Sequence, residues 1–197
     1  EMTRPLVESD ERSAGILART PMGRWGEPSA VADVVLFLAS NAARFVTLVL
    51  EQSADVAGPG PLEPTVADRW IRSRLGAALR AVDSAFSEYR LDFAATALYE
   101  FCWHEYCDWY LELVKPVLQG GDYPPAARRA ARRTLLEMLE ALLRALHPLM
   151  PFITEEIWQR VAPRAGVAGD SIMRQPFPAV TADAVDPAIE SEMRWVM

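Results

Sequence analysis

Apolar residues recur at helical spacing along most of the sequence after residue 65, and this periodicity limits the folds open to the chain. It predicts a first helix over about residues 66–86 and a third over about 125–146. A second helix is expected over about 92–115, from Asp92 as N-cap to a stop before Pro116. The stripes expected in the core are Ile71, Leu75, Leu79, Val82 and Phe86 in the first helix, and Leu135, Leu139, Leu142 and Leu146 in the third.

A fourth, shorter helix is expected over about residues 151–161, and a last amphipathic segment over about 186–196. Long amphipathic helices joined by short connections are typical of an antiparallel bundle. The sequence therefore predicts a mainly α fold after residue 65.

The chain before residue 65 has a different character. Residues 51–64 hold two Gly, three Pro and three acidic residues with little hydrophobic periodicity, which predicts a linker. Upstream, a helix is expected from about residue 27, with Pro28 in its first turn, and a strand over 45–50. One helix and one strand cannot bury a sheet edge, so we expect a small, incomplete α/β segment here.

Composition argues against several classes of protein, namely nucleic-acid-binding, membrane-spanning and secreted proteins. The net charge is −7, whereas a nucleic-acid-binding domain is expected to be basic, so the total charge argues against tight, unaided binding of nucleic acid. No apolar run reaches the roughly 18 residues of a membrane span, and the N-terminus lacks the apolar core of a signal peptide. With two cysteines in all, these features predict a protein of the reducing cytoplasm.

The stretch "FCWHEYCDWYLELVKP" (101–116) holds most of the residues with distinctive chemistry. His104, Cys107 and Asp108 share one face of a helix, but zinc requires about four ligands and no second Cys/His pair exists, so no metal site is predicted. Cys102 and Cys107 lie about 140° apart on an α-helix and are expected to stay reduced and buried. No glycine-rich turn is present to support a nucleophile, so no catalytic residue is predicted.

The aromatic residues of this stretch are too many for one helix face. Phe101 and Trp109 can face neighbouring helices, but Trp103, Tyr106 and Tyr110 cannot all share that face. Some of them are therefore expected to be partly exposed. Exposed aromatics could stack on unpaired bases, or they could form the rim of an ordinary core.

Charge is divided unevenly between the expected helices. Residues 88–112 hold one Arg and six acids, whereas residues 125–144 hold five Arg and two Glu. Four of these arginines are expected to form one stripe, which suits a phosphate backbone or is simply a solvated face. They are Arg128, Arg129, Arg132 and Arg133.

Four segments resemble the anticodon-binding domain of valyl-tRNA synthetase, a class I aminoacyl-tRNA synthetase, over about residues 67–178. They are "ADRWIRSRL" (67–75), "YRLDFAATALYEFCWHEYCDWYLELVKP" (89–116), "ARRTLLEMLEALLRALHPLMPFITEEIW" (131–158) and "SIM" (171–173). "HPLMPFITEEIW" is general to enzymes of this class for aliphatic amino acids, and "CDWYLELVKP" points to valine. The family usually has Asn at position 104 and Phe at position 106, where this chain has His104 and Tyr106.

The resemblance implies a helical bundle that binds the anticodon stem-loop of a tRNA, expected to be tRNA(Val). It implies contacts to the RNA from the first helix, through Arg69, Trp70 and Arg74, and from the end of the second helix, through Trp109 and Lys115. It also implies contacts to phosphates from the third helix, through Arg128, Arg129 and Arg132.

A second resemblance covers the N-terminal part. "TPMGRWGEPSAVADVVLFLASNAARFVT" (20–47), with "EMTRPL" (1–6) upstream, is similar to the C-terminal part of short-chain dehydrogenases/reductases, where it forms the last helix and strand of a Rossmann sheet. The similarity ends between about residues 48 and 61. The glycine-rich dinucleotide loop and the catalytic Tyr-x-x-x-Lys are missing. The alternative function is thus a remnant of an NAD(P)-dependent oxidoreductase.

Neither resemblance includes the catalytic motifs of its family. The synthetase part lacks the HIGH-like and KMSKS-like ATP motifs, the editing domain and the C-terminal coiled coil, so we expect a fragment or fusion of a valine–tRNA ligase that is not catalytic alone. ATP would belong to the intact enzyme, and no cofactor is expected in this chain. The expected division is a truncated dehydrogenase-like segment (1–50), a linker (51–64), the anticodon-binding bundle (65–178) and the start of a C-terminal helical extension (179–197).

Overall fold

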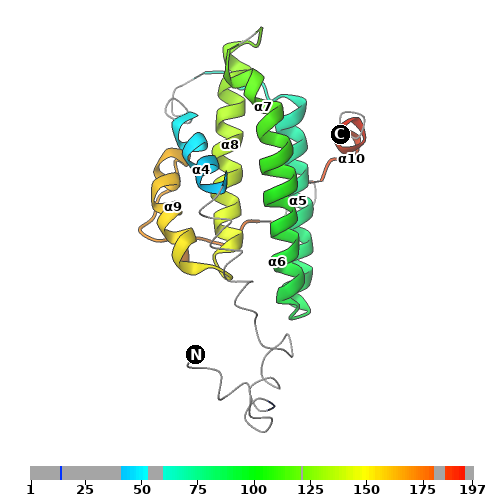
Figure 1. Cartoon of the computed structure of the whole chain (residues 1–197), viewed down its shortest axis with the longest axis vertical. Helices are drawn as coiled ribbons and strands as arrows, with labels where there is room; N and C mark the ends of the chain where they lie inside the picture. The colour runs from blue at the N-terminus through cyan, green and yellow to red at the C-terminus, as the bar shows by residue number, and fades with distance from the viewer. Residues whose placement is uncertain (1–13, 15–40, 53–59, 121, 180–184, 194–197) are drawn as a thin grey trace.

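The structure, a computed structural model, describes residue 14 and residues 41–52, 60–120, 122–179 and 185–193 (Figure 1). Within these residues it contains helices and no strands, which confirms the mainly α prediction. In chain order the elements are α4 (Asn41–Gln52), α5 (Val66–Ser87), α6 (Leu91–Glu100), the π-helix η1 (Phe101–Tyr110), α7 (Leu111–Leu118), α8 (Pro125–Leu146), α9 (Pro151–Ala165), the 3₁₀ turn η2 (Ile172–Arg174) and α10 (Pro187–Met193).

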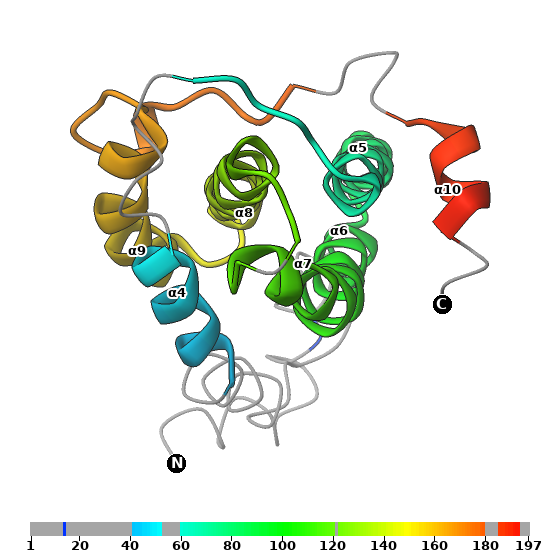
Figure 2. The ribbon, with the colours of Figure 1, turned by 90° about the horizontal axis from the view of Figure 1, so that it is seen from above.

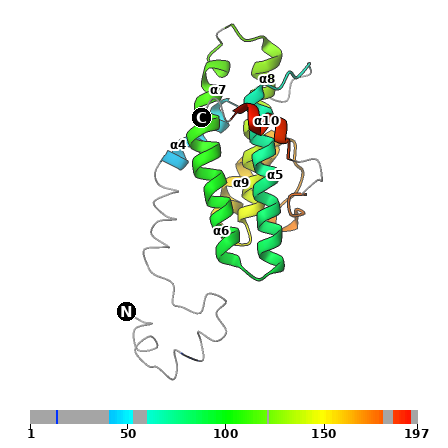
Figure 3. The same cartoon turned by 90° about the vertical axis from the view of Figure 1, so that its right-hand side faces the viewer.

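Three long helical rods form the bundle, and adjacent rods in the chain run in opposite directions (Figures 1 and 3). The first is α5, the second is the continuous rod made by α6, η1 and α7, and the third is α8. Helix α9 then reverses direction and packs on α8, while α10 lies against α5 on the other side (Figure 2). The short connections that follow α5, α7 and α8 enforce this antiparallel order.

Helix α5 begins at a capping box. The backbone N–H of Asp68 donates to Thr65 Oγ1 at 3.2 Å, and the N–H of Thr65 donates back to Asp68 Oδ2 at 2.7 Å. This reciprocal pair satisfies N–H groups that would otherwise lack partners at the helix start. The predicted start at residue 66 is confirmed, and the helix ends at Ser87, one residue beyond the prediction.

The predicted apolar stripes form the centre of the core. Ile71, Leu79 and Val82 of α5 are almost completely buried, as are Leu135 and Leu142 of α8. Phe86 and Leu146, at the ends of the stripes, are only partly buried against the same cluster. The largest fully buried side chains are aromatic: Trp70, Trp158, Tyr106, Tyr110 and Phe101.

The second rod differs from its prediction in two ways. It continues through Pro116 to Leu118, although proline has no N–H to donate to the carbonyl of Glu112 four residues earlier. Its middle part, Phe101–Tyr110, is π-helical, and the N–H of Leu111 donates to the carbonyl of Tyr106 five residues earlier. Asp92 lies inside the first turn, and Arg90 takes the N-cap position.

The predicted strand over residues 45–50 is wrong. These residues belong to helix α4, which lies beside α8 and α9 (Figure 2). Val49 is completely buried in the bundle core, and Arg164 of α9 donates to the carbonyl of Leu50 at 2.8 Å. Packing against the bundle therefore outweighs the local β-preference of a β-branched, aromatic segment. The helix expected from residue 27 and the residues matched to a dehydrogenase up to residue 40 lie outside the described residues, apart from Ala14.

The C-terminal part is also helical. Helix α9 runs beyond the predicted end at residue 161 to Ala165, where Gly166 adopts the left-handed conformation (φ 72°) typical of a C-terminal cap. The predicted segment 186–196 is a helix over Pro187–Met193, and residues 194–196 lie outside the described residues. Helix α10 belongs to the bundle, because Ile189 and Met193 are buried in the common core.

Candidate nucleic-acid interface

A buried network connects the three long rods at one level of the bundle. The hydroxyl of Tyr110 in η1 donates to Asp68 Oδ1 of α5 at 2.6 Å and lies 3.5 Å from the carbonyl oxygen of Ala131 in α8. Burial raises the pKa of Tyr110 well above its usual value, and the charge of Asp68 raises it further. Tyr110 therefore remains a donor at any physiological pH. Asp68 was not predicted to matter, although the Thr-x-x-Asp pattern at residues 65–68 is a recognisable capping signal.

The aromatic residues of η1 are divided by the π-helical winding. Phe101, Tyr106 and Tyr110 form a buried stack, with ring centroids 6.1 Å apart for the first pair and 5.8 Å for the second. The expectation that Phe101 and Trp109 face neighbouring helices, and that Trp103, Tyr106 and Tyr110 cannot all share that face, assumed α-helical winding; Tyr106 and Tyr110 are buried instead, and Trp109 is partly exposed. In a π-helix, residues four and five apart share a face, so Phe101, Tyr106 and Tyr110 all enter the core. Trp103 is half-buried, and Trp109 is 38% exposed.

Two predicted contact residues flank the buried network on the surface. Arg69 follows Asp68 in α5 and is exposed, and Trp109 precedes Tyr110 in η1. Because Asp68 contacts Tyr110 directly, their neighbours Arg69 and Trp109 lie at the same level of the bundle. The structure thus brings a cation and a partly exposed indole to one height on adjacent rods.

Trp70 does not lie on the surface. Its side chain is 2% exposed and belongs to the core between the rods. The predicted stripe does not include this position, because Trp70 lies about 100° from Ile71 around an α-helix. In this conformation its indole supports the packing of α5 and is not accessible to a base.

Arg74 is partly covered by acidic neighbours. Its guanidinium lies 2.6 Å from Glu105 of η1 and 3.4 Å from Glu190 of α10. The hydrogen bond to Glu105 raises the pKa of Arg74, and Glu190 adds to that effect, so the side chain stays charged. Helix α10 therefore shares this arginine with the rest of the bundle.

The predicted arginine stripe of α8 is only partly exposed to solvent. Arg128, Arg129 and Arg132 are half-buried. Arg129 donates to the carbonyl of Pro61 at 3.1 Å, in the segment that leads into α5. Lys115, at the end of the second rod, forms an ion pair with Glu112. Lys115 and these arginines belong to the second half of α7 and the first two turns of α8, next to the connection between the two helices.

Arg133 has a different role from the other three arginines. It donates to Glu137 at 2.6 Å, and Arg72 of α5 reaches the same carboxylate at 2.7 Å. Burial alone would raise the pKa of Glu137, but the hydrogen bonds from Arg133 and Arg72 outweigh it and hold the pKa below its usual value. Arg72 was not predicted as a functional residue. It connects α5 to α8 through Glu137.

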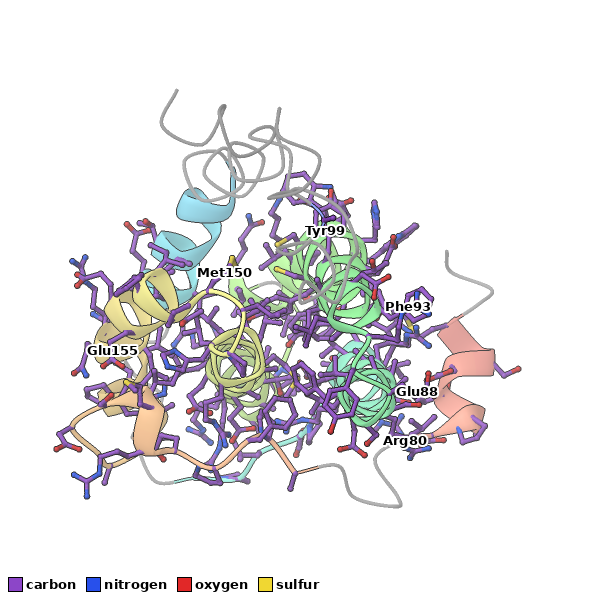
Figure 4. All side chains as sticks on the ribbon, turned by 90° about the horizontal axis from the view of Figure 1, so that it is seen from below. Arg80, Glu88, Phe93, Tyr99, Met150 and Glu155 are labelled. Atoms are coloured by element: carbon purple, nitrogen blue, oxygen red, sulfur yellow. The ribbon has the colours of Figure 1, made fainter. Side chains whose placement is uncertain are left out.

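The opposite end of the bundle has a different surface (Figure 4). Phe93 and Tyr99 are about half exposed on α6, and the guanidinium of Arg90 lies 3.7 Å from the centroid of the Phe93 ring. Phe152, at the start of α9, is 91% exposed. Exposed aromatic residues are therefore found at this end, and the half-buried arginines of α8 lie at the other, where Tyr123 is also 43% exposed.

The described part of the chain offers no group of three or more His, Cys, Asp or Glu that could hold a metal ion. His104 lies on the surface between Glu100 and Asp108, 3.7 and 3.5 Å away. Among the described helices, none is long and apolar enough to cross a membrane.

Comparisons with known proteins agree with this architecture. Residues 68–197 match the family described as the anticodon-binding domain of tRNA ligase. The valine–tRNA ligases of three Legionella pneumophila strains, Paris, Philadelphia 1 and Lens, are each 47% identical to this chain over 156 residues. The aligned part is 79% of this chain and 17% of each relative, so the chain spans about a sixth of the length of these relatives.

These matches support the synthetase resemblance over the dehydrogenase alternative. The family match covers the end of the bundle with the predicted arginines, Trp109 and Lys115, as well as the buried Asp68–Tyr110 network. It also includes α10, which packs into the common core. The chain belongs to the family of anticodon-binding domains of tRNA ligases.

Proposed function

We propose that this chain binds the anticodon stem-loop of a tRNA. The family match over residues 68–197 is the observation that supports this proposal most directly. Within the bundle, the binding surface would be the end formed by the α7–α8 turn, together with the outer face of α5 and η1 below it. This surface combines cations with a partly exposed indole, the two chemistries that a structured RNA loop requires.

The cations would contact phosphates and set the position of the RNA. Arg128, Arg129 and Arg132 are half-buried, so their aliphatic stems are held by the protein and less side-chain entropy is lost on binding. Arg69 extends the positive surface onto α5. Phosphate contacts hold the RNA in register but do not read its sequence.

Sequence would be read at unpaired anticodon bases. Trp109 is 38% exposed at the level of Arg69, where an indole can stack on a base that has left the helical stack. Trp70 would contribute indirectly, by fixing the helix that presents Arg69. The net charge of −7 makes a local cationic surface essential, because the chain as a whole repels RNA.

The tRNA is proposed to be the one that accepts valine, since the relatives are named valine–tRNA ligase. In an enzyme of that kind the domain would hold the anticodon end while a distant site uses ATP to join valine to the acceptor end. This role needs no cofactor bound to the bundle, and the cytoplasm is the compartment where it would operate.

A binding titration tests the proposal. The chain is titrated with an anticodon stem-loop bearing a valine anticodon and with a scrambled loop of the same length, each at two salt concentrations. We expect preference for the valine loop and weaker binding of both at high salt, because released counterions contribute to the affinity. Equal binding of the two loops, or no binding, would contradict the proposal.

A further inference from the structure

The two cysteines of this chain both lie on the π-helical segment, five residues apart. In an α-helix this spacing forbids a bond between them. Five residues rise about 7.5 Å and turn through about 140°, whereas a disulfide needs its Cα atoms within about 7 Å and facing side chains. The expectation that Cys102 and Cys107 cannot bridge rested on that geometry.

The π-helix changes this geometry. It places more residues in each turn, so residue i+5 returns to the face of residue i with a smaller rise. The pair one position earlier demonstrates the effect: the rings of Phe101 and Tyr106 stack with centroids 6.1 Å apart and planes 7° apart. Cys102 and Cys107 have the same spacing on the same winding. Accordingly, the hydrogen bond between Cys102 and the neighbouring Cys107 sulfur is the largest cause that raises the pKa of Cys102, and burial is the second.

The two thiols differ in their access to solvent. Cys102 is 5% exposed, whereas Cys107 is only partly buried, and both are free thiols in the structure. A small oxidant would therefore reach Cys107 first. Cys102 is protected from direct attack and lies beside its partner, which is the arrangement of a resolving cysteine.

We propose that Cys102 and Cys107 form a dithiol that hydrogen peroxide converts to an intrahelical disulfide. The Cys107 thiolate attacks one peroxide oxygen, the O–O bond breaks, and Cys107 becomes a sulfenic acid with release of hydroxide. The Cys102 sulfur, on losing its proton, then attacks the Cys107 sulfur, and the S–O bond breaks with release of a second hydroxide. Two thiols and one peroxide thus give one disulfide and two waters. This modification is independent of the proposed RNA binding.

Thiol counting after peroxide treatment tests this proposal, because the chain has no other cysteine. We expect both free thiols to disappear and the peptide that contains both residues to lose the mass of two hydrogens. The protein should stay monomeric on a non-reducing gel, and its helical circular dichroism should not change. Dithiothreitol should restore both thiols.

Single and shifted cysteines provide the controls. In Cys102→Ser, Cys107 should stop at the sulfenic acid and react with dimedone, which the oxidised original chain should not do. In Cys107→Ser combined with Asp108→Cys, the thiols are six apart, and no intramolecular disulfide should form; Asp108 is exposed, so the bundle should tolerate the change. Two surviving thiols in the original chain, a disulfide only between molecules, closure in the shifted variant or loss of helix on oxidation would each overturn the proposal.

Discussion

The hydroxyl of Tyr110 donates a 2.6 Å hydrogen bond to Asp68, the same carboxylate that accepts from Thr65 at the start of α5. One side chain therefore both caps a helix and joins that helix to its neighbour. Asp68 is completely buried, and a buried carboxylate is tolerated only when its oxygens are fully paired. Because Arg69 and Trp109 adjoin this pair in sequence, the pair also sets the height of two predicted RNA contacts.

Replacing Tyr110 with Phe should destabilise the bundle. The substitution keeps the ring but leaves Asp68 Oδ1 without the donor that the hydroxyl provides, so we expect the free energy of unfolding to fall by about 1–3 kcal/mol. Urea denaturation followed by circular dichroism measures this change. Tyr99→Phe is the matched control, because Tyr99 is half exposed on α6. Equal stability of the two variants would show that the buried bond contributes nothing.

Replacing Ser73 with Ala should loosen α10. The Ser73 hydroxyl accepts from the N–H of Asp186 at 2.8 Å and donates to Glu190 at 2.8 Å, at a position that is 2% exposed. Loss of both bonds should cost about 1–2 kcal/mol of local stability. Hydrogen exchange in residues 186–193 should therefore become about tenfold faster. Ser84→Ala, on the exposed side of the same helix, should leave this exchange unchanged, and an equal acceleration in both variants would contradict the assignment.

Glu137 should make the stability of the α5–α8 contact dependent on pH. Its folded pKa lies below the usual value of 4.5, so its contribution is fully present above pH 4.5 and is lost as the pH falls through the folded pKa. Glu137→Gln should therefore reduce stability at pH 7, by about 1 kcal/mol given its partial exposure, and should make little difference at the lowest pH where the chain still folds. Unfolding measured from pH 3 to pH 7 tests this.

Glu156→Gln is the control for this pH dependence. Glu156 pairs with Arg160 on the exposed face of α9, and such a pair contributes little to stability. A difference between Glu137→Gln and the original chain that persists unchanged at low pH would contradict the proposed role of the Glu137 carboxylate.

Much of the bundle follows from local sequence signals. The capping pattern of Thr65 and Asp68 marks the start of α5, and Pro125 in its favoured N-terminal position marks the start of α8. Apolar spacing identifies most of the core in these two helices, because a long amphipathic helix has only one face that it can bury. These features depend on residues close together in the chain, so they can be recognised without a structure.

Other features depend on contacts between distant residues. The hydroxyls of Tyr106 and Tyr110 find partners in Leu135 of α8 and Asp68 of α5, and these contacts accompany a π-helical winding that helical periodicity alone does not reveal. The burial of Val49 depends on α8 and α9, which lie far away in the sequence. The local preference of residues 45–50 for a strand could not indicate this packing.

The candidate site was only partly accessible to sequence reasoning. The resemblance suggested which helices would contact RNA, but exposure and pairing depend on the neighbours of each side chain. Trp70 is buried, and Arg74 is shared between Glu105 and Glu190. Neither fact can be read from a pattern of charged and aromatic residues, because both depend on how α10 and η1 pack on α5.

Replacing Arg128 and Arg132 with Ala should weaken binding of the anticodon stem-loop without changing its preference for the valine anticodon. These side chains lie one turn apart in α8, and contacts to phosphate contribute affinity but little sequence selectivity. The slope of log affinity against log salt concentration should become shallower by about 1–2, since about two phosphate contacts are lost. Titrations of the valine and scrambled loops at several salt concentrations measure both quantities.

The matched control removes the same charge elsewhere. Arg160 of α9 and Arg174 of η2 are well exposed, pair with Glu156 and Asp170, and lie outside the α7–α8 turn. Replacing both with Ala lowers the net positive charge by the same amount, so any long-range electrostatic effect on RNA binding should be similar in the two double variants. A larger loss for Arg128 and Arg132 assigns the RNA to the α8 end of the bundle. Equal losses would mean that total charge, and not this surface, determines the affinity.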